Sequence, residues 1–163
     1  MKKQGFTLIE LMVVIVIMGI LAAVAVPKLF GMIAKSKASE VGPAAGTYIK
    51  LQDAYVSESN SLGTWTLIGY VAPGASSASD ASPHTTNFTY YGNIASATDI
   101  SSGTSQNDAW VAVNRVALND CSADGGKWNV NIAGNSNGNS VKYTAQVSTA
   151  CKQLTPTFEK IGQ

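Results

Sequence analysis

The sequence has few of the residues on which catalysis or metal binding depends. Its 163 residues include one histidine, His84, and two cysteines, Cys121 and Cys151. It has no nucleophile elbow, no phosphate-binding glycine loop and no carboxylate pair with a local catalytic signature. One histidine and two distant cysteines do not make a tetrahedral ligand set. We therefore expect no enzyme, no cofactor and no metal site. Asp120 and Asp124 could suggest calcium, but turn capping is the favoured reading.

Charged residues are also scarce and balanced. Eleven Lys and Arg face ten Asp and Glu, which gives a formal net charge of +1. The basic residues are scattered, whereas a nucleic-acid site needs them gathered on one face. The sequence therefore predicts no recognisable nucleic-acid site.

Apolar residues, in contrast, are concentrated near the N-terminus. The twenty-one residues from Phe6 to Val26 carry a single charge, Glu10. As a helix this segment is about 31 Å long, which matches the hydrocarbon thickness of a bilayer. Beyond about Ser57 the chain is rich in Ser, Thr, Asn and Gly, which is typical of turns and exposed loops. The pattern indicates an apolar stalk followed by a polar head.

Three kinds of segment share this pattern. A secretory signal would use Lys2 and Lys3 as its basic region and Ala23-Val24-Ala25 as its cleavage site, but the apolar run exceeds the usual 7–15 residues. A plain anchor explains the length but not Glu10, because a carboxylate inside a membrane is costly and suggests a function. The third kind is an anchor that is cut and then assembled.

Glu10 favours this third reading. If the chain is cut between Gly5 and Phe6, the new α-amino group of Phe6 lies one helical turn from the Glu10 carboxylate. The two could pair within one chain or between neighbouring chains. The alternative is that Glu10 complements the positive end of the helix dipole, worth about 0.3–1 kcal/mol.

The start of the sequence resembles that of type IV pilins and type II secretion pseudopilins. Lys2-Lys3-Gln4-Gly5 followed by Phe6-Thr7-Leu8-Ile9-Glu10 is similar to their class III leader and mature start, and Gly19 and Pro27 also match. The resemblance covers about the first thirty residues. It implies cleavage after Gly5 by prepilin peptidase and N-methylation of Phe6. It further implies that Glu10 neutralises the amine of an adjacent subunit, and that the helix bends or partly melts near Gly19 and Pro27 in a filament.

The resemblance implies a function and a location. The chain would be stored in the bacterial inner membrane and added by a pilus assembly platform to a homo-oligomeric helical filament on the cell surface. Such a type IV pilus serves attachment, twitching motility or DNA uptake. The alternatives are a type II secretion pseudopilin and, from another class, a bitopic envelope protein that does not assemble.

We expect three regions and an α+β fold. Residues 1–5 would be a leader, residues 6–27 the stalk, a transmembrane and filament-core helix, and residues 28–163 the head. The head would contain the amphipathic second half of the helix, with a kink at Gly42-Pro43 and an end between Ser57 and Ser61. This helix would pack on an antiparallel sheet, with Glu40 on its polar side.

The sheet is predicted from period-2 patterns and turn residues. Strands are expected at residues 65–68, 88–91, 109–118, 128–132 and 141–147, with a hairpin loop at residues 134–139. Two cysteines in a chain that enters the membrane favour a disulfide between Cys121 and Cys151, with two separate buried thiols as the alternative. In pilins such a pair encloses a surface segment called the D-region.

Overall fold

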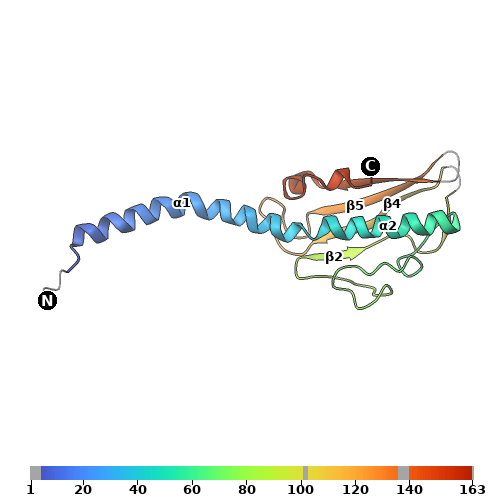
Figure 1. The fold of residues 1–163 in the computed structure, drawn as a ribbon, viewed down its shortest axis with the longest axis horizontal. Helices are drawn as coiled ribbons and strands as arrows, with labels where there is room; N and C mark the ends of the chain where they lie inside the picture. The colour runs from blue at the N-terminus through green and yellow to red at the C-terminus, as the bar shows by residue number, and fades with distance from the viewer. Residues whose placement is uncertain (1–4, 101–102, 136–139, 163) are drawn as a thin grey trace.

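The protein consists of a long N-terminal helix that leads into a compact α+β head (Figure 1). The computed structural model describes residues 5–100, 103–135 and 140–162. Helix α1 spans Leu8–Ala38 and helix α2 spans Val41–Ser59. Most of α1 projects away from the head, whereas α2 lies along the sheet. The predicted α+β architecture, with one long helix packed on an antiparallel sheet, is confirmed.

The junction between α1 and α2 lies at Ser39 and Glu40, just before the predicted kink at Gly42-Pro43. Proline has no N–H to donate and its ring clashes with the carbonyl four residues earlier, which here belongs to Ser39. The regular helix therefore breaks there. Pro43 itself lies in the first turn of α2, where no intrahelical donor is required.

Helix α2 ends where the sequence predicts. It stops at Ser59, and Asn60 adopts a left-handed conformation with φ 55° while its N–H donates to Val56 O. Asparagine tolerates this conformation better than most residues, so it makes a suitable helix end. One buried polar residue on α2 was not foreseen. The Gln52 side chain is fully buried, and with its amide nitrogen turned to the Gly63 carbonyl it pairs with both backbone groups of Gly63, at 3.0 and 2.8 Å.

The head contains a four-stranded antiparallel sheet in the order β2-β4-β5-β6. Its strands are β2 (Phe88–Tyr91), β4 (Ser105–Asn114), β5 (Lys127–Gly134) and β6 (Val141–Val147). A separate pair is formed by β1 (Ser61–Leu62) and β3 (Thr98–Asp99). Two short 3-10 helices, η1 (Thr149–Leu154) and η2 (Phe158–Lys160), follow the last strand.

Most strand predictions are confirmed. The strands predicted at 88–91, 128–132 and 141–147 correspond to β2, β5 and β6, and β5 and β6 form the expected hairpin. Asn135 N–H donates to Ser140 O at 2.9 Å at its base, while residues 136–139 of the predicted loop lie outside the described residues. The central strand β4 starts and ends about four residues earlier than predicted.

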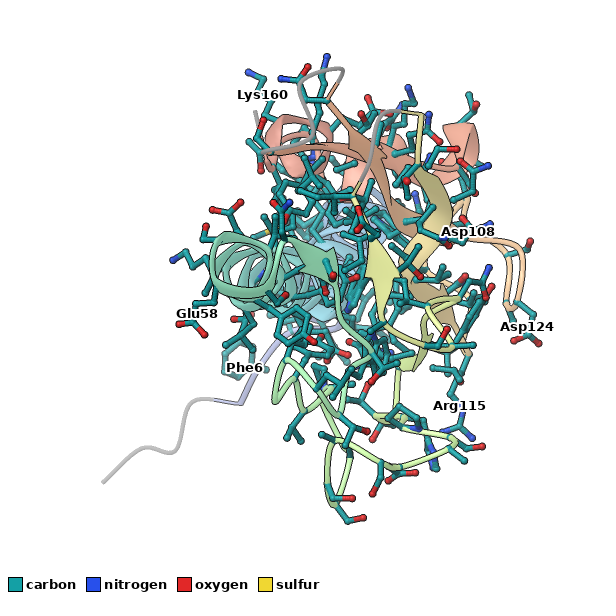
Figure 2. The ribbon with its side chains drawn as sticks, turned by 90° about the vertical axis from the view of Figure 1, so that its right-hand side faces the viewer. Phe6, Glu58, Asp108, Arg115, Asp124 and Lys160 are labelled. Carbon is teal, nitrogen blue, oxygen red and sulfur yellow. A yellow bond between two sulfur atoms is a disulfide. The ribbon has the colours of Figure 1, made fainter. Side chains whose placement is uncertain are left out.

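A bulge accounts for the irregular start of β4. The pairing register with β5 shifts between Gln106 and Trp110, and Asp108 has φ 56°. Its carboxylate accepts hydrogen bonds from Lys127 Nζ at 2.6 Å and Asn129 Nδ2 at 2.9 Å. In Figure 2 Asp108 lies across the head from Glu58 of α2, so this polar network covers the face of the sheet that α2 does not cover.

The strand predicted at residues 65–68 is wrong. These residues form turns, in which Ile68 N–H donates to Thr64 O at 3.0 Å. Gly69 ends the segment with φ 68°, a conformation that favours glycine. The Trp65 ring packs edge-on against Tyr70, with ring centres 5.0 Å apart. The apolar residues therefore anchor a loop to the core instead of pairing in a sheet.

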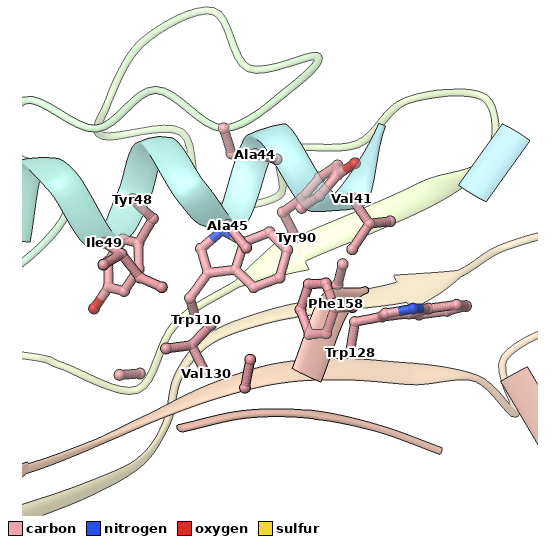
Figure 3. Close-up of a cluster of buried hydrophobic side chains, with 14 of the residues drawn as sticks. Val41, Ala44, Ala45, Tyr48, Ile49, Tyr90, Trp110, Trp128, Val130 and Phe158 are labelled. Atoms are coloured by element: carbon pink, nitrogen blue, oxygen red, sulfur yellow. The ribbon is translucent and has the colours of Figure 1, made fainter. Parts of the chain in front are cut away.

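The core of the head lies between α2 and the sheet. Figure 3 shows Ala45 and Tyr48 of α2 facing Trp110 of β4, with Phe158 of η2 beside Trp110. Both Trp110 and Trp128 are fully buried, and Trp110 Nε1 donates to Tyr70 Oη at 2.8 Å. Each aromatic side chain buries about 150–250 Å² and dominates such a core.

The structure contains a disulfide between Cys121 and Cys151, the pair singled out from the sequence. Cys121 follows β4 and Cys151 lies in η1, so the bond joins the two ends of the β5-β6 hairpin region. Gly126 lies directly against the bond. A Cβ atom at this position would come within 2.7 Å of Cys151 Sγ and 2.6 Å of Asn114 Oδ1.

Candidate functional site

The projecting part of α1 is mostly apolar, and nearly all of its residues before Ala34 are exposed. The first buried residue of the helix is Ala34, and Ala38 is the next. The side chains before Ala34, including Phe6 at the free end, contact little of their own chain. By length and composition the helix can cross a membrane, with a mean hydropathy of 2.9 over its most apolar window. Such a surface requires a membrane or other protein subunits to cover it.

Glu10 takes part in the cap at the N-terminal end of this helix. Thr7 is the N-cap, and its backbone N–H and its hydroxyl donate to Glu10 Oε2 at 2.8 and 2.7 Å. The Glu10 N–H donates in return to Thr7 Oγ1 at 3.4 Å. This reciprocal arrangement is a capping box, which satisfies backbone donors that the first helical turn leaves unpaired.

The capping box uses only one carboxylate oxygen of Glu10. Within residues 5–100, 103–135 and 140–162, no donor is recorded for Glu10 Oε1. The bonded donors both belong to Thr7, which lies after the Gly5-Phe6 bond, so a cut at that bond would not remove them. The carboxylate can therefore cap its own helix and still offer an oxygen to a cation.

The remaining positions singled out in the stalk are accessible. Gly5 and Phe6 are exposed and precede the helix, so the bond between them is not protected by regular structure. A Cβ at Gly19 would meet no atom within 4 Å. Pro27 lies within the continuous helix α1, which bows along its length in Figure 1. Lys2, Lys3 and Gln4 of the leader lie outside the described residues.

The helix junction carries a contact that was not foreseen. Glu40, expected on the polar face of the helix, is half-buried and accepts hydrogen bonds at Oε1 from Tyr90 Oη at 2.7 Å and Thr85 Oγ1 at 2.6 Å. The pKa of Tyr90 is raised, mainly because the phenol is buried and secondly because it donates to the negatively charged Glu40 carboxylate. Glu40 thereby ties the start of α2 to β2 and to the loop before it.

The other polar residues considered from the sequence, His84, Asp120 and Asp124, lie in loops and turns. His84 is exposed, with Nδ1 2.8 Å from Ser82 O. Asp120 accepts a hydrogen bond from the adjacent Asn119 at 3.2 Å, and Asp124 stands in a turn with φ 55°. Across the part of the chain that the structure describes, no group of three or more His, Cys, Asp or Glu residues could hold a metal ion.

An exposed apolar helix on a small α+β head, with a carboxylate at its free end, defines a pilin-like architecture. Comparison with known proteins agrees. Residues 1–26 match the family described as the prokaryotic N-terminal methylation motif. The chain therefore carries the type IV pilin motif at its N-terminus.

Several similar proteins match part of this chain. The type IV major pilin protein PilA of Myxococcus xanthus (strain DK1622) is 44% identical over 57 residues, which cover 35% of this chain and 26% of that protein. The type IV major fimbrial protein FimA of Dichelobacter nodosus is 56% identical over 39 residues, 24% of this chain and 25% of that protein. The fimbrial protein EcpC of Eikenella corrodens is 54% identical over 44 residues, 27% of this chain and 29% of that protein. The chain spans about a quarter of the length of the relatives it matches.

The capping box and the Glu40 contact differ in how far the sequence could have predicted them. The capping box could have been found, because Thr7-Leu8-Ile9-Glu10 has the T-x-x-E spacing that marks a helix start before an apolar run. The Glu40 contact could not, because its partners Thr85 and Tyr90 lie 45 and 50 residues away along the chain.

Proposed function

We propose that this chain is the precursor of a structural subunit of a type IV pilus. It is held in the inner membrane by its N-terminal helix and cut between Gly5 and Phe6 by prepilin peptidase. The mature subunit, methylated at Phe6, then enters a homo-oligomeric filament on the cell surface through an assembly platform.

The observation that carries the proposal is the arrangement at Glu10. The carboxylate lies at the start of an otherwise apolar, exposed helix, and its Oε2 already accepts two hydrogen bonds from Thr7. A cap alone needs no charge at this depth, because a neutral glutamine also forms a capping box. A charged carboxylate gains most if a cation comes close to it in surroundings of low dielectric constant. The α-amino group of Phe6, from the same or a neighbouring subunit, supplies that cation.

Three substitutions separate the charge of Glu10 from its capping role. Glu10→Gln removes the charge and keeps a capping amide, whereas Thr7→Val removes the hydroxyl and keeps the charge. Glu58→Gln, on the exposed end of α2, is the matched control for the loss of one carboxylate. Each variant is expressed in a strain whose own copy is deleted, and surface filaments are counted by electron microscopy.

We expect processed Glu10→Gln subunits in the membrane but few filaments, and near-normal filaments for Thr7→Val and Glu58→Gln. Normal filaments from Glu10→Gln would refute the pairing. A loss confined to Thr7→Val would show that only the cap matters.

Mass spectrometry of the mature chain tests the processing step. The proposal requires a chain that starts at N-methylated Phe6. An intact Met1 would mean a plain membrane anchor, and a start at Val26 would mean an ordinary secreted protein. Surface filaments distinguish a pilus subunit from a pseudopilin, whose filament is a short piston inside the cell envelope.

A further inference from the structure

A groove with two lysines at its rim and a largely apolar floor lies where α1 enters the head. It has a volume of about 330 Å³ and is bounded by Lys28, Gly31, Met32 and Lys35 of the helix and, from the head, by the polar Asn119, Asp120 and Gln153 and the apolar Leu118, Ala150 and Leu154. The first group recurs at positions i, i+3, i+4 and i+7, so it forms one face of the helix. The second group comes from the segments that the disulfide joins. The space beside Gly31 is open, because a Cβ there would meet no atom within 4 Å.

Both lysines of this groove are exposed and available. The ion pairs recorded among the described residues are Lys127–Asp108 and Lys152–Glu159, so neither Lys28 nor Lys35 has a carboxylate partner there. Asp120 also borders the groove, but its carboxylate accepts a hydrogen bond from Asn119. With two cations and one anion on its walls, the groove carries a net positive charge.

The position of the groove along the helix matches the membrane surface. Lys28 lies two residues beyond Val26, which is about 3 Å at 1.5 Å per residue. Lys35 lies nearly two turns further, but helical side chains tilt towards the helix N-terminus and therefore, here, towards the bilayer. Long lysine side chains also extend along apolar surface to reach the lipid headgroups.

We propose that this groove binds the phosphodiester headgroup of an anionic phospholipid while the subunit is stored in the membrane. Lys28 and Lys35 donate to the phosphate oxygens, and the amide of Gln153 lies where the polar end of the headgroup reaches. The lipid then holds the head against the bilayer surface until the subunit leaves the membrane. This inference rests on the membrane-stored subunit of the proposed function.

The test uses the full-length protein in phosphatidylcholine vesicles with and without phosphatidylglycerol. After extraction into mild detergent, native mass spectrometry counts the lipids that remain bound. Lys28→Gln/Lys35→Gln removes both groove cations, and Gly31→Leu fills the groove without changing charge. Lys37→Gln/Lys50→Gln is the matched control, because it removes two exposed lysines that do not line the groove.

We expect one retained phosphatidylglycerol per wild-type chain and little retained phosphatidylcholine. At about 1 kcal/mol per lysine, the groove double variant should bind phosphatidylglycerol about 30-fold more weakly. Gly31→Leu should also lose the lipid, and the control should keep it.

Several outcomes would overturn the inference. These are equal retention of both lipids, retention in the groove double variant, and displacement of the lipid by inorganic phosphate, which would assign the groove to free phosphate. A lipid-free dimer that the same variant abolishes would assign the groove to a second copy of the chain.

The proposed function can fail separately. Absence of the protein from the membrane fraction would refute the stored subunit, whereas a membrane-resident, correctly processed protein without lipid preference would refute this inference alone.

Discussion

Breaking the bond between Cys121 and Cys151 should lower the free energy of unfolding of the head by about 3–4 kcal/mol. The cysteines are 30 residues apart in sequence. For a loop of that length the chain-entropy model gives about 12 cal/mol/K, or about 3.6 kcal/mol at 25 °C. Small domains have total stabilities of about 5–15 kcal/mol, so the head should remain folded but become marginal.

The fluorescence of Trp110 and Trp128 can report this loss. Both rings are fully buried beside the disulfide-closed region and α2, so unfolding of the head exposes them to water. The full-length Cys121→Ala/Cys151→Ala variant and the wild type are unfolded with urea in mild detergent, which keeps the stalk helix covered. The midpoint should fall and the slope of the transition should rise modestly, because the unfolded chain without the cross-link is less compact and exposes more surface.

Reduction of the wild type provides the control. A thiol reductant opens the bond without removing side-chain volume, whereas the double variant also loses the two sulfur atoms. If loss of the closed loop is the main effect, reduced wild type and the double variant should have nearly equal stabilities. A loss below about 1 kcal/mol in both would refute the chain-entropy reasoning. A large loss in the variant alone would mean that the buried cavity, and not the loop, is responsible.

Three further results are expected for the head, each measured by the same urea titration. Tyr90→Phe should cost about 1.5–3 kcal/mol because it removes a charge-assisted hydrogen bond to Glu40, and a double cycle with Glu40→Gln should be non-additive; additive losses would count against the contact. Gly126→Ala should cost about 1–3 kcal/mol by forcing a methyl group against Cys121 Sγ, and an unchanged midpoint would contradict that packing. Burial raises the pKa of Tyr70 to about 12, above its value of about 10 in unfolded chains, so the neutral phenol stabilises the fold. The contribution of Tyr70 to the free energy of unfolding should be complete below about pH 10. It should decline by about 2–3 kcal/mol as the pH rises through about 12, and the Tyr70→Phe variant should show a smaller loss of stability at alkaline pH.

The sequence predicts the parts of the fold that local patterns determine. The helix end near Asn60 and strands β2, β5 and β6 follow from alternating apolar residues and turn residues close by in the chain. The wrong strand prediction at residues 65–68 has a physical cause. Residues 65–68 have the composition of a strand, but Trp65 packs against Tyr70 and not against a pairing partner. Strand propensity reflects packing surroundings that a local pattern does not contain.

The candidate site divides in the same way. Gly5, Phe6 and Glu10 could be chosen from a motif of a few residues, because the observed cap and the proposed cleavage and charge pairing all lie within about one helical turn. The groove at Lys28 and Lys35 depends on head residues more than 80 positions away along the chain. From the sequence alone, these lysines are counted among scattered basic residues, and no groove is predicted.

The two halves of the molecule are nearly independent in energy. Helix α1 buries only Ala34 and Ala38 among its residues, so the stalk before them contributes almost nothing to the packed core of the head. Burial of each large apolar side chain of the stalk is worth about 1.5–3 kcal/mol, and that free energy remains available for a membrane or for neighbouring subunits. In the proposed function, a transfer of the stalk from a membrane into a filament would be nearly neutral in hydrophobic terms, because both surroundings are apolar. The proposed pairing of Glu10 and the proposed lipid contact of Lys28 and Lys35, which differ between the two surroundings, are therefore the features that would favour one state over the other.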